Sequence, residues 1–213
     1  MLLLAFDTAT PAITVALHDG SSVLAEVSQV DAMRHGEYLA PNIAEVLARA
    51  GASRQDVTDI AVGVGPGPYT GLRVGVVTAR TLAASLGAHL HGVCSLDVLA
   101  AGFTGSGPFA VATDARRKEV YWARYDPDHR RVAGPDVARP GDLATLLGSG
   151  LPVIGRGAHA YADVLHAVDG PLDPDATALA ELVVRGGAER LPPEPLYLRR
   201  PDARPPGTRK RAS

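Results

Sequence analysis

Two aspartates hold matching places in the two halves of this 213-residue chain, because each follows a short apolar run. Carboxylates that face each other across a cleft could hold a hydrated Mg²⁺ beside a nucleotide, although the same side chains could equally cap turns. The first reading predicts an ATP-dependent phosphotransferase or an ATPase. Its candidate nucleotide-binding residues are Asp7, Thr8, Gly65, Gly67 and Asp114.

The segment at 65–75, GPGPYTGLRVG, is the most distinctive stretch of the chain and invites comparison with phosphate-binding loops. It contains no lysine, which a Walker loop requires, and Thr70 stands where the dinucleotide fingerprint requires glycine. Pro66 and Pro68 also remove two backbone N–H donors from the loop. Close packing of this loop against neighbouring backbone therefore explains the glycines at least as well as phosphate binding does.

Other residues with catalytic chemistry are isolated in the sequence. His89 and His91 would share one face of a strand, but no third metal ligand is evident beside them. No serine occupies a Gly-x-Ser-x-Gly elbow, and Cys94 ends an apolar run, which is typical of a buried small hydrophobic residue. We therefore predict no catalytic residue and no metal site.

Hydrophobic periodicity supplies the elements that must position these residues. Apolar runs indicate strands at 2–6, 13–17, 23–27, 60–64 and 90–94. Apolar residues at helical spacing indicate helices at 35–50, 72–86 and 95–101, and in the second half at 158–168 and 176–189. The helix at 72–86 is apolar nearly all round, with Arg73 and Arg80 as its only charges, so it is either sandwiched within one domain or covered by another subunit.

The two halves of the chain repeat this order of elements. An offset of 107 residues pairs Asp7 with Asp114, and an offset of 90 pairs two Gly-x-Gly turns that follow strands. This duplicated α/β pattern resembles the actin, hexokinase and heat-shock-70 ATPase architecture, in which two ribonuclease-H-like lobes with mixed sheets flanked by helices face one cleft. We expect lobes at 1–105 and 106–198 and a basic tail at 199–213.

Composition limits the function classes further. The formal net charge is -2, 46% of the residues are hydrophobic and there is a single cysteine, which together indicate a cytoplasmic protein without disulfides. The opening apolar run is too short for a membrane span and lacks a basic region before it, so we expect neither a signal peptide nor an anchor. The basic tail could attract RNA phosphates or be a solvated terminus.

Five motifs give the chain a resemblance to the TsaB (YeaZ) family: LAFDTAT at 4–10, HGEYL at 35–39, GPGPYTGLRVG at 65–75, CSLD at 94–97 and PLYLR at 195–199. The family usually has serine at the position of Pro68. The resemblance implies a non-catalytic scaffold subunit of the complex that forms N6-threonylcarbamoyladenosine at position 37 of ANN-decoding tRNAs. Such a subunit would bind and activate TsaD, be joined by the ATPase TsaE, reach tRNA through the complex and form a homodimer when TsaD is absent.

The resemblance also implies where chemistry and contacts lie. TsaD, the catalytic paralogue, carries two metal-binding histidines whose positions fall here on Ser95 and Leu99, so ATP and metal are expected in the partner subunits and no cofactor is held firmly by this chain. A metallopeptidase of the glycoprotease type would need the same missing site. The expected partner-binding residues lie on the two long helices: His35, Leu39, Ile43, Val46, Leu47, Arg73, Val76, Val77 and Arg80.

Overall fold

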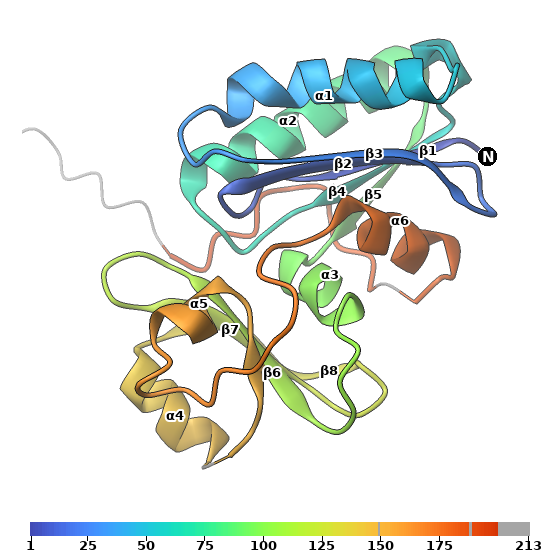
Figure 1. Ribbon diagram of the computed structural model, residues 1–213. Helices are drawn as coiled ribbons and strands as arrows, with labels where there is room; N and C mark the ends of the chain where they lie inside the picture. Colours follow the sequence, from blue (N-terminus) through green and yellow to red (C-terminus); the bar gives the residue numbers. More distant parts are fainter. Residues whose placement is uncertain (149, 188, 200–213) are drawn as a thin grey trace, which may run out of the picture.

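The computed structural model describes residues 1–148, 150–187 and 189–199, which form two lobes, each built around one sheet (Figure 1). The sheet of the first lobe has the spatial strand order β3-β2-β1-β4-β5. β1, β2 and β3 form an antiparallel meander, whereas β1 and β5 run parallel to β4. The strands are β1 (Leu3–Asp7), β2 (Ala12–His18), β3 (Val23–Val30), β4 (Asp59–Gly63) and β5 (His89–Val93).

Helices cover both faces of this first sheet, which explains why β1 and β2 are buried at every position. Leu4 and Phe6 of β1 share one core with the two long helices α1 and α2, and Leu3 and Ala5 share another with α3 and α6. No helix in the described ranges is long and apolar enough to cross a membrane. These helices are α1 (His35–Arg49), α2 (Tyr69–Leu86), α3 (Ser95–Ala101) and α6 (Ala176–Val184).

The sheet of the second lobe repeats the topology of the first. Its order β8-β7-β6-β9 matches β3-β2-β1-β4, with β6 antiparallel to β7 and parallel to β9. Asp7 and Asp114 end the equivalent strands β1 and β6. The predicted duplicated α/β fold of the actin-like architecture is therefore confirmed. The elements are β6 (Phe109–Asp114), β7 (Val120–Tyr125), β8 (Arg131–Ala138), α4 (Pro140–Leu147), β9 (Val153–Ile154) and α5 (Arg156–Ala160).

The end of the chain departs from the expected lobe boundaries. The helix predicted at 176–189 for the second lobe is α6, which instead packs against β1 and β2 of the first. Leu191 then pairs with Gly92 of β5, and the Leu196 N–H donates to the Val64 carbonyl at 2.8 Å. The helix predicted at 158–168 is shorter and earlier, as α5. Assigning all of 106–198 to the second lobe was therefore wrong for this returning segment.

The predicted basic tail lies outside the described residues except for its first member. Arg199 donates from Nη1 to the Ala115 carbonyl at 3.0 Å and forms an ion pair with Glu119. Both partners belong to the β6–β7 turn. The C-terminal segment thus runs from the edge of the first sheet to a hairpin of the second lobe.

Candidate functional site

A cavity of about 210 Å³ lies between the lobes and is lined by two of the predicted nucleotide-binding residues. It brings Thr8 from the β1–β2 turn together with Asp114 from the end of β6, as the sequence predicted. The volume falls below the roughly 300–1,000 Å³ of typical ligand and cofactor pockets. The remaining lining includes Ala9, Thr10, Met33, His35, Thr70, Gly71, Thr113, Arg116 and Arg156.

Asp7 does not line this cavity, which corrects its assignment as a nucleotide-site residue. Its side chain is buried, with 1% exposure. The Ala9 N–H donates to Oδ1 at 2.6 Å, and the Ser95 hydroxyl donates to Oδ2 at 2.6 Å. The Gly65 N–H in turn donates to Ser95 Oγ at 3.1 Å, so the carboxylate is tied to the glycine-rich loop from within.

Burial also changes the acidity of this carboxyl group. Removal from water disfavours the ionised form and raises the pKa of Asp7 from 3.8 to about 6, although the hydrogen bonds from Ser95 and Ala9 act in the opposite direction. A carboxylate that is desolvated and already accepts two hydrogen bonds is a poor ligand for hydrated Mg²⁺. The pair Asp7 and Asp114 is consequently not a metal-binding pair in this structure.

The glycine-rich loop is closed by backbone packing rather than open for phosphate. A side chain at Gly67 would collide with the carbonyl of Ala9, and one at Gly71 with the carbonyl of Thr8. The Thr8 hydroxyl donates to the Gly71 carbonyl at 2.8 Å. Gly65 and Gly67 do not line the cavity, so the prediction that they contact a nucleotide is wrong for this conformation and the close-packing interpretation is correct.

Ser95 and Leu99, which align with the metal-binding histidines expected in TsaD, have structural roles in this chain. Ser95 holds Asp7, and Leu99 is fully buried in the core between α3 and the second sheet. His91 places Nε2 3.0 Å from Asp59 Oδ1, within hydrogen-bond distance, so this histidine has a partner within the chain. Within the described ranges, no three histidine, cysteine or acidic side chains gather as metal ligands.

Most of the apolar residues predicted to bind a partner belong to the chain's own core. Leu39, Ile43, Val46 and Val76 are at most 8% exposed, and Leu47 packs against the same core. Leu39, Ile43, Val46 and Val76 are buried against the first sheet, so their assignment as partner-binding residues was wrong, whereas Leu47 is half-buried. His35 is likewise buried, with Nε2 2.8 Å from the Thr10 carbonyl oxygen.

An exposed row of side chains along α2 remains, which we call the α2 stripe: Tyr69, Arg73, Val77 and Arg80. Val77 is 56% exposed and Tyr69 49%. Arg73 Nη1 donates to the Tyr69 hydroxyl at 2.9 Å, and its guanidinium lies 4.9 Å from the centre of that ring. The stripe keeps three of the predicted residues and adds Tyr69, which the sequence analysis missed.

Tyr197 extends the stripe from the returning C-terminal segment. Its ring stacks on Tyr69 with centroids 5.1 Å apart, and it is 41% exposed. Met33, 88% exposed in the turn before α1, lines the interlobe cavity. The motif PLYLR at 195–199 was the available sequence signal for Tyr197, but nothing in it shows the stacking partner.

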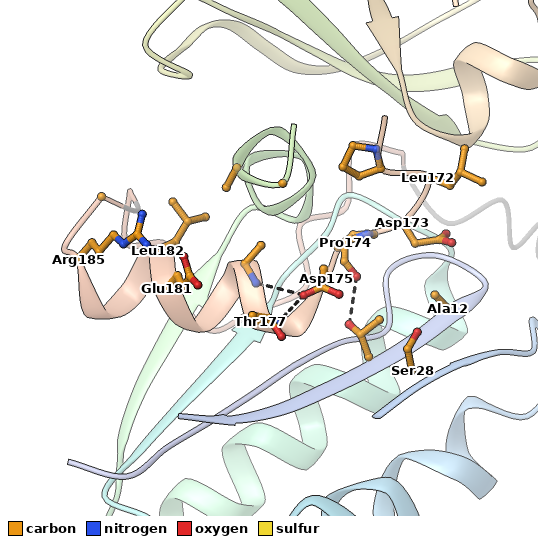
Figure 2. Close-up of a pocket in the computed structure, with 16 residues that line it drawn as sticks. Ala12, Ser28, Leu172, Asp173, Pro174, Asp175, Thr177, Glu181, Leu182 and Arg185 are labelled. Atoms are coloured by element: carbon orange, nitrogen blue, oxygen red, sulfur yellow. Dashed lines mark hydrogen bonds and ion pairs between the residues drawn. The ribbon is translucent and has the colours of Figure 1, made fainter. Parts of the chain in front are cut away.

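A second, larger cavity of about 620 Å³ lies between α6 and the first sheet (Figure 2). Several of its polar side chains form contacts within the chain. Asp175 accepts hydrogen bonds from the N–H groups of Thr177 and Ala178, Thr14 Oγ1 donates to the Pro174 carbonyl, and Asp173 binds Arg156 through two bonds of 2.7 Å. None of the predicted site residues lines this cavity.

Comparison with known proteins identifies relatives along most of the chain. The family model for TsaD, tRNA N6-adenosine threonylcarbamoyltransferase, matches residues 22–180. An uncharacterised protein of Mycobacterium leprae is 44% identical over 208 residues, which are 96% of this chain and 56% of the relative. The tRNA threonylcarbamoyladenosine biosynthesis protein TsaB of Escherichia coli is 36% identical over 135 residues, 62% of this chain and 58% of the relative. The chain thus spans less than two thirds of the length of these two relatives.

A solved structure agrees over nearly the whole fold. It is a Pseudomonas aeruginosa protein described as similar to the peptidase YeaZ, and it matches with a TM-score of 0.80 at 30% identity. The match covers 93% of this chain and 99% of the solved one.

Proposed function

The chain belongs to the TsaB (YeaZ) family, and we propose that it is a non-catalytic subunit in the biosynthesis of threonylcarbamoyladenosine in tRNA. In this role it binds the catalytic paralogue TsaD and stabilises its active form. TsaE joins this pair, and a homodimer forms through the same face when TsaD is absent.

One observation carries the non-catalytic part of the proposal. Ser95, at a position where the catalytic paralogue is expected to have a metal-binding histidine, instead donates a hydrogen bond to buried Asp7 and accepts one from Gly65. Gly67 and Gly71 pack against the carbonyls of Ala9 and Thr8, and neither Asp7 nor Gly65 lines the interlobe cavity. In this proposal the chain keeps the actin-like architecture, but Asp7, Ser95 and the glycine-rich loop stabilise the fold and do not bind phosphate.

The α2 stripe supports the docking part of the proposal. Exposed tyrosine and arginine side chains are enriched among the residues that dominate binding energies at protein interfaces. Tyr69 is fixed here by Arg73 on one side and by Tyr197 on the other, so little side-chain entropy remains to be lost on binding. Val77 lies two helical turns from Tyr69 and supplies an exposed apolar contact in the same row.

Val77→Glu tests the docking face against a matched control. If Val77 is covered by TsaD, the new carboxylate replaces an apolar contact and loses its hydration, which weakens association by about 1–3 kcal/mol, or roughly ten- to a hundredfold, even with Arg73 and Arg80 one turn away. Val132→Glu adds the same charge at a valine of nearly equal exposure, 57%, on β8 of the second lobe. We expect co-purification with TsaD to be lost for the first variant and kept for the second.

Co-purification of the Val77→Glu variant at wild-type level would overturn the assignment of this face. Light scattering of the chain alone and mixed with TsaD measures whether a heterodimer replaces a homodimer. The alternative function, an ATP-dependent phosphotransferase or ATPase, rests on Asp114 at the interlobe cavity. It predicts ATP turnover by the isolated chain that is lost in Asp114→Asn, whereas a non-catalytic subunit shows no turnover in either form.

A further inference from the structure

The turn between β6 and β7 presents three consecutive cationic side chains, Arg116, Arg117 and Lys118, which we call the basic hairpin. All three are exposed, and all three have positive φ, at 61°, 56° and 61°. The backbone around them is fixed: Asp114 Oδ1 accepts the Arg116 N–H at 2.8 Å, and the Glu119 N–H donates to the Arg116 carbonyl at 3.1 Å. Glycine, asparagine or aspartate would adopt these left-handed conformations more easily.

The basic hairpin is also part of a concentration of positive charge in an otherwise acidic chain. Nine of the 21 basic residues lie at 116–118 and 199–211, with Asp202 as the one acidic residue in those stretches. The remainder of the chain has 12 basic and 22 acidic residues. Arg199, whose side chain contacts Ala115 and Glu119, joins the two stretches at the base of the hairpin.

The position of the hairpin relates it to the proposed docking face. Arg116 lines the interlobe cavity together with Met33 and Thr70, which flank the starts of α1 and α2. Figure 1 shows the β6–β7 turn on the same side of the molecule as the N-terminal ends of these two helices. A ligand bound to the hairpin would therefore lie beside a partner docked on the α2 stripe.

We propose that the basic hairpin contacts the phosphodiester backbone of tRNA next to the docked partner. This inference rests on the proposed function, which supplies an RNA substrate to the assembled complex. Guanidinium and ammonium groups pair with phosphate oxygens and release condensed counterions, so such contacts strengthen binding and position the RNA without reading its sequence. The hairpin then acts as a positioning surface, and the chemistry remains in the partner.

The test compares two double variants that each remove two exposed positive charges. Arg116→Gln with Lys118→Gln changes the hairpin, whereas Arg54→Gln with Arg130→Gln changes two exposed arginines outside it. Fluorescence anisotropy with a labelled tRNA transcript measures binding by the full chain, alone and in complex with TsaD, over a series of salt concentrations. The hairpin variant should bind at least about tenfold more weakly at 0.1 M salt, and its salt slope should fall by about 2, because each phosphate contact contributes roughly 0.9 to that slope.

The control variant should bind tRNA like the wild type, and so should the charge-conserving pair Arg116→Lys with Lys118→Arg. Equal tRNA affinity of the wild type and the hairpin variant would overturn the inference. So would a hairpin variant that loses binding only to vesicles containing phosphatidylserine, since that result assigns the charge to a membrane surface. Co-purification with TsaD is measured on the same proteins. If the wild type does not bind TsaD, the proposed function is refuted. If the wild type and the hairpin variant both bind TsaD and also bind tRNA equally well, only the proposed role of the basic hairpin is refuted.

Discussion

Asp7→Asn should change how the stability of this protein depends on pH. The side chain of Asp7 is 1% exposed, and burial raises its pKa from 3.8 to about 6. The folded state therefore holds the Asp7 proton more tightly than the unfolded chain does. The stabilising effect is fully present below pH 3.8 and is lost as the pH rises through about 6. Asparagine has nearly the same shape and does not titrate, so it removes this dependence.

The magnitude follows from the difference between the two pKa values. The difference between a pKa of 3.8 and one of about 6 corresponds to about 3 kcal/mol, since a tenfold change in proton affinity corresponds to roughly 1.4 kcal/mol. About 2 kcal/mol of this change falls between pH 4.5 and 7.5, because the wild-type carboxyl is still largely protonated in the folded state at the lower value. Over this range the wild type should lose about 2 kcal/mol of unfolding free energy relative to Asp7→Asn.

Urea unfolding of the two proteins at four pH values between 4.5 and 7.5 measures this difference. Trp122, the single tryptophan, is 7% exposed in the second lobe and supplies the fluorescence signal. Other groups also contribute to the pH dependence of stability, including Asp97, whose pKa is raised by burial. Their contributions are common to both proteins and cancel when one unfolding free energy is subtracted from the other.

Parallel pH profiles for the two proteins would refute the reasoning. A difference that stays constant to within about 0.5 kcal/mol would mean that Asp7 titrates near its ordinary value, and hence that the carboxyl is hydrated in solution. The interlobe cavity would then have to admit water to Asp7, and the case against a metal at this position would fail with it.

Three further predictions concern Ser95, the glycine-rich loop and Cys94. Ser95→Ala removes a hydrogen-bond donor to Asp7 and the acceptor of the Gly65 N–H, so it should lower the free energy of unfolding by about 1–3 kcal/mol and raise the pKa of Asp7 further. The same urea series measures both effects, and an unchanged urea midpoint would contradict the prediction. Gly71→Ala should lower the free energy of unfolding by about 1–3 kcal/mol, because the new methyl group collides with the Thr8 carbonyl. Gly141→Ala should leave the melting temperature nearly unchanged, because a Cβ at this position has no neighbouring atom within 4 Å. Equal melting temperatures of the two variants would contradict the prediction. Cys94 is fully buried, and burial raises its pKa to about 12, so a thiol reagent should modify it only after denaturation; rapid reaction of the native protein would disprove its burial.

The sequence predicted the elements of the first lobe well, because the spacing of apolar residues along each element depends on which of its faces are buried. The continuous apolar residues of β1 and the helical spacing in α1 both correspond to what the structure shows. The placement of α6 was wrong for a physical reason: an apolar helix face shows that the helix must be covered but not which sheet covers it. Only the contacts with β1 and β2 assign α6 to the first lobe.

The same limit explains the errors in the predicted partner surface. Leu39, Ile43 and Val46 recur at helical spacing, and this pattern is identical whether the face meets the chain's own sheet or another subunit. On α2, Val76 is 1% exposed and the next residue, Val77, is 56% exposed. A difference of one position therefore separates a core residue from a surface residue, and hydropathy alone does not resolve it.

The glycine-rich loop shows how one local pattern can serve two incompatible purposes. Glycines allow a phosphate to approach the backbone closely, and they equally allow another stretch of backbone to do so. Here Gly67 and Gly71 admit the carbonyls of Ala9 and Thr8, and the Thr8 hydroxyl bond to Gly71 holds the turn in place. A phosphate at this loop would have to displace that turn, break the bond and expose the network that buries Asp7. Closing the loop therefore stabilises the lobe and leaves no open phosphate-binding turn in this conformation, which is consistent with the non-catalytic role that we propose.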